Sequence, residues 1–433
     1  MAPRKRRRTC TPLSAGAATT ASPPPMASEL PVELLVEIVA RSDFATVVRC
    51  AATCKLLRRE ILTPAFARRV CGAPPRLVGF LRGGRRAFSL VHPRRRPPRP
   101  TPSATSPPSS PAPAPASGLK EYEVVTARAG LALLERRVIN GRRRSERRSD
   151  LCVYDPVTGA RAFFPFPPNI LRDGLAGAVY TYALVTAAIG CPFVLLAADM
   201  SSLLDFTTTV RVQTASPSGS DAAAGGGQWG PVKLVDVRGP GRCLADTYNS
   251  AVVLGGVVHW LMYSRDSIFT YDVVTGATGS VELPDGARWP EGKGRYALEA
   301  KLAASPDGRL KLLVANEFTV SVWVLRPGSR WNWEPPAVID TEATIRSALD
   351  PDGGGGHGIK IITGRGEIKL VNSGDQRTDA VFLRVTVDNG RPGGRDELLV
   401  LDVETKEIRR VRENGGVLYE VDLASRLSAM KIL

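Results

Sequence analysis

The sequence predicts a small unit of three α-helices followed by a larger all-β domain. Helical spacing of apolar residues is confined to residues 29–70 of the 433-residue chain, and short strand-like segments separated by turns dominate from residue 119 onward. Gly and Pro together make up about one residue in six, which suits many turns and argues against an all-helical protein. The length is sufficient for two or three domains, each with its own core.

The net charge of +16 is concentrated in one part of the chain. Residues 1–150 contain 29 basic and 10 acidic residues, whereas the remainder has a net charge of −3. We expect residues 1–28, which are basic and then rich in Ala, Thr and Pro, to form a disordered tail. Its basic cluster indicates a nuclear-import signal, with a solvated tail without a role as the alternative; the cluster consists of Arg4, Lys5, Arg6, Arg7 and Arg8.

The cysteines and the apolar stretches bear on the compartment. Seven scattered cysteines, an odd number, and the lack of a readable secretory signal favour a reducing compartment, the nucleus and/or the cytoplasm. Residues 174–198 are free of charge and long enough to cross a membrane. Because Gly190-Cys191-Pro192 divides this stretch, we interpret it as two buried strands joined by a turn and expect no membrane association.

The helical pattern begins with apolar residues spaced along one helix face, namely Pro31, Leu34, Leu35 and Ile38. We expect the first helix to begin at or near this proline, where a missing N–H is harmless. Ser42 or Asp43 is the expected cap of a second helix, and Thr53 that of a third, which Pro64 ends. Three helices in about 40 residues cannot bury much surface alone, so the unit is expected to need a partner.

These residues also carry a family resemblance. The sequence Leu30-Pro31-x-Glu33-Leu34-Leu35-x-Glu37-Ile38, then Arg49-Cys50-Ala51-Ala52-Thr53-Cys54-Lys55-x-Leu57-Arg58, then Ile61 and Pro64-x-Phe66, resembles an F-box over its whole length. The resemblance implies a three-helix unit that binds a Skp1-like adaptor and, through it, a cullin–RING ubiquitin ligase.

The resemblance also implies which residues face the adaptor: Leu30, Pro31, Leu34, Ile38, Val48, Cys50, Cys54 and Leu57. Leu57 departs from the family pattern, in which many members carry an aromatic residue, and we expect this to affect internal packing most. The alternative is that residues 29–70 are an ordinary helical hairpin packed on the larger domain.

The β-domain is expected to span residues 76–433. A hairpin expected at 76–91 is too short to be stable alone and is assigned to this domain. The segment 93–117, with 10 prolines in 25 residues, is then a disordered insertion within the domain.

Three similar strand–turn segments recur in this domain. Each has an apolar strand that ends in Asp, followed by a Thr-Gly or Thr-Lys turn; the aspartates are Asp155, Asp272 and Asp402. We expect each carboxylate to bond to backbone two or three residues on, and Gly159 and Gly276 to supply positive φ. The spacings of 117 and 130 residues are close to three blades of about 45 residues, so the sequence predicts a β-propeller of six to eight blades. A two-sheet sandwich is the alternative.

The β-domain has a looser resemblance of its own. The segments Gly256-Val-Val-His259-Trp-Leu and Tyr271-Asp-x-x-Thr-Gly276 look like the F-box-associated propeller domains of large plant families. His259 is interpreted as a packed, hydrogen-bonded residue. Trp331-Asn332-Trp333 is interpreted as an outer strand between blades, with a recognition site as the alternative.

Catalytic, cofactor-binding and metal-binding motifs are not found, so no site of these kinds is assigned and the chain is not expected to be an enzyme. The favoured hypothesis is a non-catalytic substrate receptor of an SCF-type ubiquitin ligase, which binds a Skp1-like adaptor, through it a cullin, and an unknown target protein. The alternative is a nuclear, nucleic-acid-associated protein that uses its Arg-rich tail and loops. Because the Arg-rich tail and loops lack interleaved aromatic residues that would stack on bases, nucleic acid is not the expected partner.

Overall fold

The structure is a computed structural model. It describes residues 30–42, 44–71, 76–82, 89–91, 119, 122–136, 151–156, 159–167, 180–186, 193–200, 209–217, 227–237, 251–262, 267–287, 299–329, 331–349, 361, 368–371, 380–388, 394–411 and 417–421. The tail expected at 1–28 and the insertion expected at 93–117 lie outside these residues.

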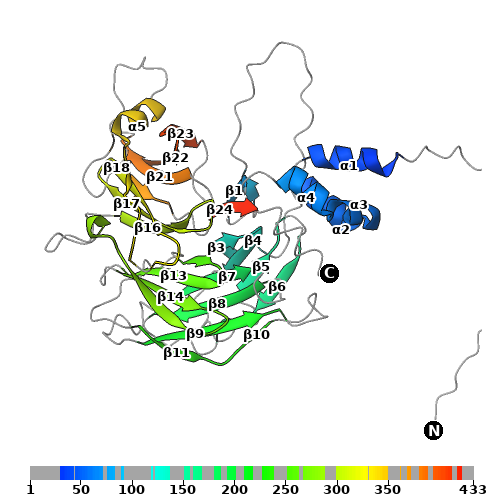
Figure 1. Ribbon diagram of the computed structural model, residues 1–433, viewed down its shortest axis with the longest axis horizontal. Helices are drawn as coiled ribbons and strands as arrows, with labels where there is room; N and C mark the ends of the chain where they lie inside the picture. Colours follow the sequence, from blue (N-terminus) through cyan, green and yellow to red (C-terminus); the bar gives the residue numbers. More distant parts are fainter. Residues whose placement is uncertain are drawn as a thin grey trace, which may run out of the picture.

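Four helices form the N-terminal unit, beside the sheets in Figure 1. They are α1 (Val32–Arg41), α2 (Phe44–Thr53), α3 (Lys55–Ile61) and α4 (Pro64–Cys71). Helix α1 begins after Pro31, as expected, and the carbonyl of Pro31 accepts the N–H groups of Leu34 and Leu35 at 3.0 and 3.2 Å.

The ends of the later helices differ from the sequence prediction. Thr53 is the last residue of α2, and its hydroxyl donates to the Arg49 carbonyl at 2.8 Å, so it does not cap α3. A threonine hydroxyl inside a helix can bond back one turn, which competes with capping. Pro64 does not simply end the helical region; it opens α4, whose Phe66 N–H donates to the Thr63 hydroxyl at 3.3 Å.

Five sheets of four or five strands are arranged as a five-bladed β-propeller. Blade 1 contains β3 (Tyr122–Arg128), β4 (Leu131–Arg136), β5 (Leu151–Tyr154) and β6 (Arg161–Phe164). Blade 2 contains β7 (Tyr180–Thr186), β8 (Phe193–Asp199), β9 (Thr209–Ser216), β10 (Gln228–Trp229) and β11 (Lys233–Asp236). Blade 3 contains β12 (Val252–Leu254), β13 (Val257–Met262), β14 (Ser267–Asp272) and β15 (Thr278–Glu282).

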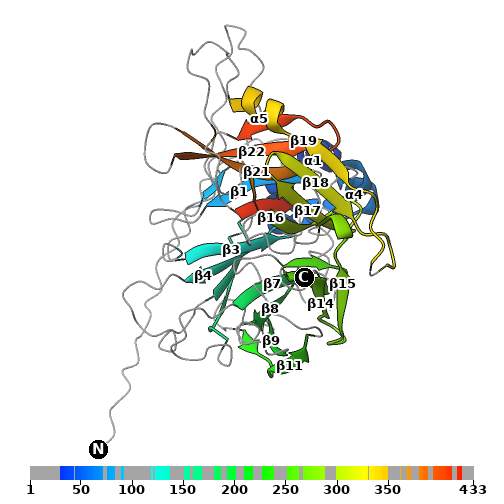
Figure 2. The same cartoon turned by 90° about the vertical axis from the view of Figure 1, so that its left-hand side faces the viewer.

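Blade 4 contains β16 (Glu299–Ala304), β17 (Leu310–Asn316), β18 (Thr319–Val324) and β19 (Ala337–Asp340). Blade 5 contains β20 (Ile368–Leu370), β21 (Ala380–Val387), β22 (Arg395–Asp402) and β23 (Ile408–Val411). A 3₁₀ turn, η3 (Asp285–Ala287), follows blade 3, and a helix not expected from the sequence, α5 (Glu342–Leu349), connects blades 4 and 5 (Figure 2).

The first strands of the blades are neighbours around the ring. β3 contacts β7, β7 contacts β12, β12 contacts β16, and β16 contacts β20. Apolar residues fill the junctions between successive blades, so the sheets of blades 2, 3 and 4 are covered on both faces and the core is divided among the junctions. This is propeller packing and not a two-sheet sandwich.

The expected count of six to eight blades is not confirmed, and the aspartate turns show why. Asp155, Asp272 and Asp402 each lie at the end of the third strand of a blade, but of blades 1, 3 and 5. Successive motifs are therefore two blades apart rather than three. Since spacings of 117 and 130 residues each span two blades, a blade with its connection takes about 60 residues of chain.

The chemistry expected of these turns is present at Asp272 and Asp402. The Asp272 carboxylate accepts the N–H groups of Val274 and Thr275, each at 2.9 Å. Asp402 does the same two and three residues on, at 3.0 and 2.9 Å. Gly276 has φ +72°, whereas the equivalent position of blade 5 is Lys406, with φ +58°.

A three-stranded sheet, here called the closing sheet, joins the two ends of the β-domain. It pairs β1 (Arg76–Arg82) with β2 (Ser89–Val91) and with β24 (Val417–Val421). The hairpin at 76–91 is thereby joined to the last described strand of the chain. The closing sheet shares apolar clusters with blades 1 and 5, and the hydroxyl of Tyr419 donates to the Gly130 carbonyl at 2.9 Å.

The charge-free stretch 174–198 contributes two strands. β7 and β8 pair antiparallel within blade 2, with Leu184 opposite Leu195, which confirms two strands. No helix among the described residues is long and apolar enough to cross a membrane.

Candidate functional site

A line of exposed apolar side chains runs along α1. Leu30, Leu34 and Ile38 follow one another at four-residue intervals and are 54%, 51% and 55% exposed. Leu34 and Ile38, spaced by four, lie on one face of α1, and Leu30 lies just before the start of the helix. We call these three residues the α1 strip. Isolated exposed leucines are common on proteins, but an aligned set indicates a contact surface.

The opposite face of α1 holds the unit together. Val39 is 5% exposed and packs with Val47 and Ala51 of α2 and with Ile61 of α3. Among the described residues, Phe66 of α4 is the remaining buried member of this cluster. The unit thus has a small core, and one side of α1 is left for a partner.

A carboxylate fixes α1 against the last helix of the unit. Glu37 forms an ion pair with Arg69 of α4 and a second one with Arg41 at 2.8 Å. The hydrogen bond from Arg69 lowers the pKa of Glu37 below its ordinary value of 4.5. Because these groups are exposed, the pairs orient α1 and add little stability.

The structure separates the eight predicted adaptor residues into two groups. On α1 and just before it, Leu30, Pro31, Leu34 and Ile38 are available at the surface. Val48, in contrast, is completely buried, so the structure corrects its assignment to the exposed surface.

The remaining three are partly buried. Cys50 and Leu57 pack against the core cluster, and Cys54 precedes α3 as its cap residue. Leu56, which sequence reasoning missed, is 54% exposed instead of Leu57. The spacing gives the reason: Leu57 lies four residues before the buried Ile61 and therefore shares its inward face.

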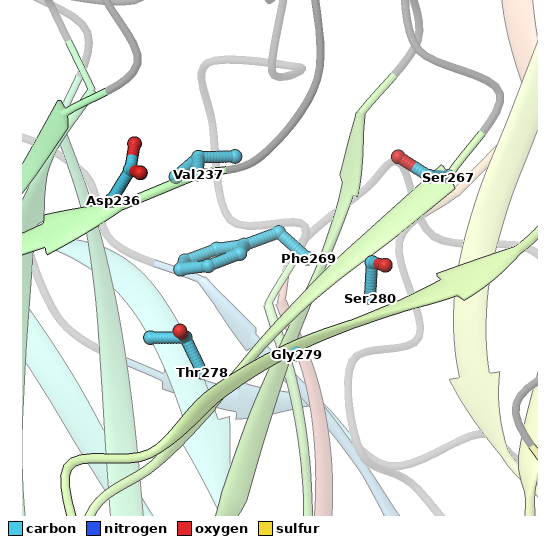
Figure 3. A pocket seen from close by; sticks show the side chains of 7 residues that line it. All are labelled: Asp236, Val237, Ser267, Phe269, Thr278, Gly279 and Ser280. Atoms are coloured by element: carbon cyan, nitrogen blue, oxygen red, sulfur yellow. The ribbon is translucent and has the colours of Figure 1, made fainter.

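A second feature is a slot in the β-domain. A cavity of ≈ 200 Å³ lies between the outer strands of blades 2 and 3 (Figure 3). Its lining residues are Asp236, Val237, Ser267, Phe269, Thr278, Gly279 and Ser280. Phe269 forms an apolar wall, and its ring stacks on Trp260 with centroids 5.6 Å apart.

The strand register places the slot's polar groups together. Phe269 of β14 is opposite Ser280 of β15, so their side chains share one face, which is turned toward blade 2. Asp236 and Val237 approach from the end of β11. The result is one carboxylate and three hydroxyl groups around an aromatic ring.

Two other sequence interpretations are answered by the structure. His259 is a packed residue whose Nδ1 lies 3.2 Å from the Val252 carbonyl, and burial lowers its pKa. The tryptophan pair divides: Trp333 is buried and its indole donates to the Glu282 carbonyl of blade 3 at 2.8 Å, whereas Trp331 is 72% exposed. Residues 331–333 do not form an outer strand.

The basic cluster Arg4–Arg8 lies outside the described residues. The nuclear-import signal therefore stays a prediction from the sequence.

Comparison with known proteins supports the division into two parts. Residues 27–73 match the F-box-like family model, which agrees with the helical unit. An F-box-like domain implies a Skp1-like partner in general, and its combination with a propeller is typical of non-catalytic adaptors. Among curated proteins, none matches the chain.

Solved structures show only distant similarity. A functionally unknown protein from Desulfotomaculum acetoxidans is 14% identical, with a TM-score of 0.33 over 69% of this chain and 74% of that one. A luciferin-regenerating enzyme is 10% identical, with a TM-score of 0.31 over 68% and 76%. A structure described as YCF48 bound to D1 peptide is also 10% identical, with a TM-score of 0.29 over 67% and 66%.

A second family model, described as a domain of unknown function, DUF7595, also matches the chain. It covers residues 96–350, from before blade 1 to the end of α5, which is more than half of the chain. The protein therefore carries an F-box-like domain at its N-terminus and belongs to the DUF7595 family.

Proposed function

We propose that this protein is the substrate-recognition subunit of an SCF-type cullin–RING ubiquitin ligase. The observation that carries the proposal is the α1 strip: three apolar residues, each about half exposed, two on the first helix of an F-box-like unit and one just before it. The strip would bind a Skp1-like adaptor, and the adaptor would connect the chain to a cullin.

The rest of the molecule suits the role of a target receptor. The propeller has a core that runs through the junctions between successive blades, so its surface can hold a target in a fixed orientation. Catalysis would come from partner subunits, because holding a target near a ubiquitin-charged enzyme raises the effective concentration of the reacting groups. We propose that this takes place in the nucleus and/or the cytoplasm.

The test is co-purification with a Skp1-like adaptor. Leu34→Asp and Ile38→Asp place a carboxylate in the centre of the α1 strip, and burying that charge without a partner is strongly unfavourable. We expect adaptor retention to fall at least about tenfold in either variant. Since both residues are exposed, the stability of the helical unit should change by less than about 0.5 kcal/mol.

A matched control is Leu234→Asp in β11. Leu234 is 70% exposed, so this variant adds the same charge to an exposed leucine outside the helical unit. Adaptor retention should equal that of the unchanged chain. If Leu34→Asp and Ile38→Asp retain the adaptor as well as this control does, the α1 strip is not the binding surface and the proposal fails.

A further inference from the structure

The slot between blades 2 and 3 has a composition that selects for one kind of ligand group. Its polar side chains are the Asp236 carboxylate and the hydroxyls of Ser267, Thr278 and Ser280. Within the described part of the chain, none of these four side chains has a hydrogen-bond or ion-pair partner. A carboxylate only accepts hydrogen bonds, and each hydroxyl oxygen can accept them. The slot thus offers acceptors to a group rich in donors.

The size of the slot limits what can enter. A cavity of ≈ 200 Å³ is smaller than the pockets of about 300 Å³ and upward that hold drug-sized ligands. One long side chain fills such a space. The Phe269 ring, fixed by its stacking on Trp260, can pack against the methylene stem of that side chain while its polar head reaches the carboxylate.

The surroundings of the slot indicate a protein ligand. Two large apolar residues of the elements that line it are exposed: Leu234, two residues before Asp236 in β11, is 70% exposed, and Val274, in the turn between β14 and β15, is 62% exposed. The side chain of Lys233 in β11 reaches the turn between β14 and β15, where its Nζ would lie 3.5 Å from a Cβ placed on Gly276. Exposed apolar residues beside a polar pocket are typical of protein interfaces.

The edge of blade 3 offers backbone as well. Among the described strands, β15 pairs only with β14, and no described strand lies along its other edge; Glu282, at the end of β15, accepts the Trp333 indole N–H. Three of the slot residues, Thr278, Gly279 and Ser280, belong to this strand. An extended peptide can therefore bond along β15 and direct an alternate side chain into the slot.

From these observations we propose that the slot recognises an arginine or lysine side chain in an extended segment of the target protein. Arginine has five N–H donors and no acceptor, and lysine has three donors, which complements a carboxylate and three hydroxyls. An acidic or phosphorylated side chain would meet the Asp236 carboxylate instead. This inference rests on the proposed function, since it names the class of segment that the receptor binds.

The test uses the full chain and an array of immobilised ten-residue peptides in which one position is varied through all residue types. Peptides with Arg or Lys at that position should retain about fivefold more protein than the same peptides with Gln or norleucine. In Asp236→Asn the preference should disappear, and in Asp236→Arg it should turn toward Asp and Glu. The thermal unfolding midpoints of both variants should match that of the unchanged chain.

The control variant is Glu404→Gln, which removes an exposed carboxylate from the turn after β22 of blade 5 and should leave the preference intact. A preference that persists in Asp236→Asn, or the lack of any preference for basic residues in the unchanged chain, overturns the inference. Adaptor retention is measured on the same preparations. Adaptor binding without a basic preference refutes the slot alone, and a basic preference without adaptor binding refutes the ligase proposal alone.

Discussion

The helical unit and the β-domain differ in how many of their large apolar side chains are exposed. Four large apolar side chains are more than half exposed in the described helical unit of about forty residues, and they are Leu30, Leu34, Ile38 and Leu56. The whole described β-domain has only four, which are Leu234, Val274, Trp331 and Val338. The β-domain buries its apolar residues between blades, whereas the helical unit keeps a line of them in solvent.

This difference shows where each part obtains its stability. The blades of the propeller are covered by their neighbours and by the closing sheet, so the domain needs no further partner to complete its core. The helical unit has a small core, and the described residues leave the α1 strip exposed. Substitutions of buried residues should therefore lower the free energy of unfolding in both parts. Substitutions in the α1 strip should instead weaken adaptor binding.

The largest expected effect is at the closing sheet. Tyr419 is completely buried and bonded to the Gly130 carbonyl, so Tyr419→Ala removes a large side chain from the junction that completes the ring. We expect the free energy of unfolding of the β-domain to fall by about 3–5 kcal/mol in chemical denaturation. Tyr419→Phe, which removes the hydroxyl alone, should cost about 1–2 kcal/mol. Equal effects of the two substitutions would mean that packing at this junction is unimportant.

The next largest effect is a difference in stability between alanine substitutions of two isoleucines in the helical unit. Ile61→Ala empties part of the small core and should cost about 2–4 kcal/mol, measured as loss of helical circular dichroism on heating. Ile38→Ala removes the same atoms from an exposed site and should change stability by less than about 0.5 kcal/mol while weakening adaptor binding. If both variants lose stability alike, Ile38 is not a free binding residue.

A pH effect is expected in the β-domain. Burial raises the pKa of Glu299 to about 7, against a hydrogen bond from the Leu370 backbone and the charges of Lys369 and Arg384, which lower it. Between pH 4.5 and 7 the unfolded chain ionises this carboxyl and the folded chain does not. The contribution of Glu299 to stability is therefore fully present below pH 4.5, falls as the pH rises to 7, and is constant above.

The comparison that isolates this contribution is Glu299→Gln. The thermal unfolding midpoint of the variant should fall less between pH 4.5 and 7 than that of the unchanged chain. Glu404→Gln, which replaces an exposed carboxylate, should not alter the slope. A slope that is the same in all three proteins would show that Glu299 titrates normally.

The smallest effect concerns the aspartate turns. Lys406 has φ +58°, where blades 1 and 3 have Gly159 and Gly276. Lys406→Gly should relieve this strain and raise the unfolding free energy by about 0.5–1 kcal/mol. Gly276→Ala in the equivalent turn of blade 3 should destabilise by a similar amount. Opposite signs for the two substitutions, measured by chemical denaturation, are the result that supports the assignment.

The sequence was most informative where local chemistry decides the structure. The exposed positions Leu34 and Ile38 follow from helical spacing, and the turns at Asp272 and Asp402 follow from a carboxylate that can reach nearby N–H groups. The first strand pair, β1 with β2, was also predictable. Each of these features depends on residues close together in the chain.

Features that depend on distant residues were not predictable in the same way. The family resemblance implies that Val48 and Leu57 face the adaptor, but in the structure Val48 is fully buried and Leu57 packs against the core of the helical unit. The number of blades was overestimated because the repeated turn occurs in alternate blades. The slot requires β11 and β14 to lie side by side, and no motif in either strand indicates that.

The pairing of β1 with β24 imposes an order on the folding of the protein during its synthesis. About 350 residues separate Cys71, where α4 ends, from Val421, where β24 ends. A ribosome that adds about 5–20 residues per second takes tens of seconds to cover them. Because the contacts of the helical unit's core lie within residues 30–71, that unit can fold long before β24 emerges. A nascent chain that stops short of Val417 thus carries the complete α1 strip on a ring that has no means of closing.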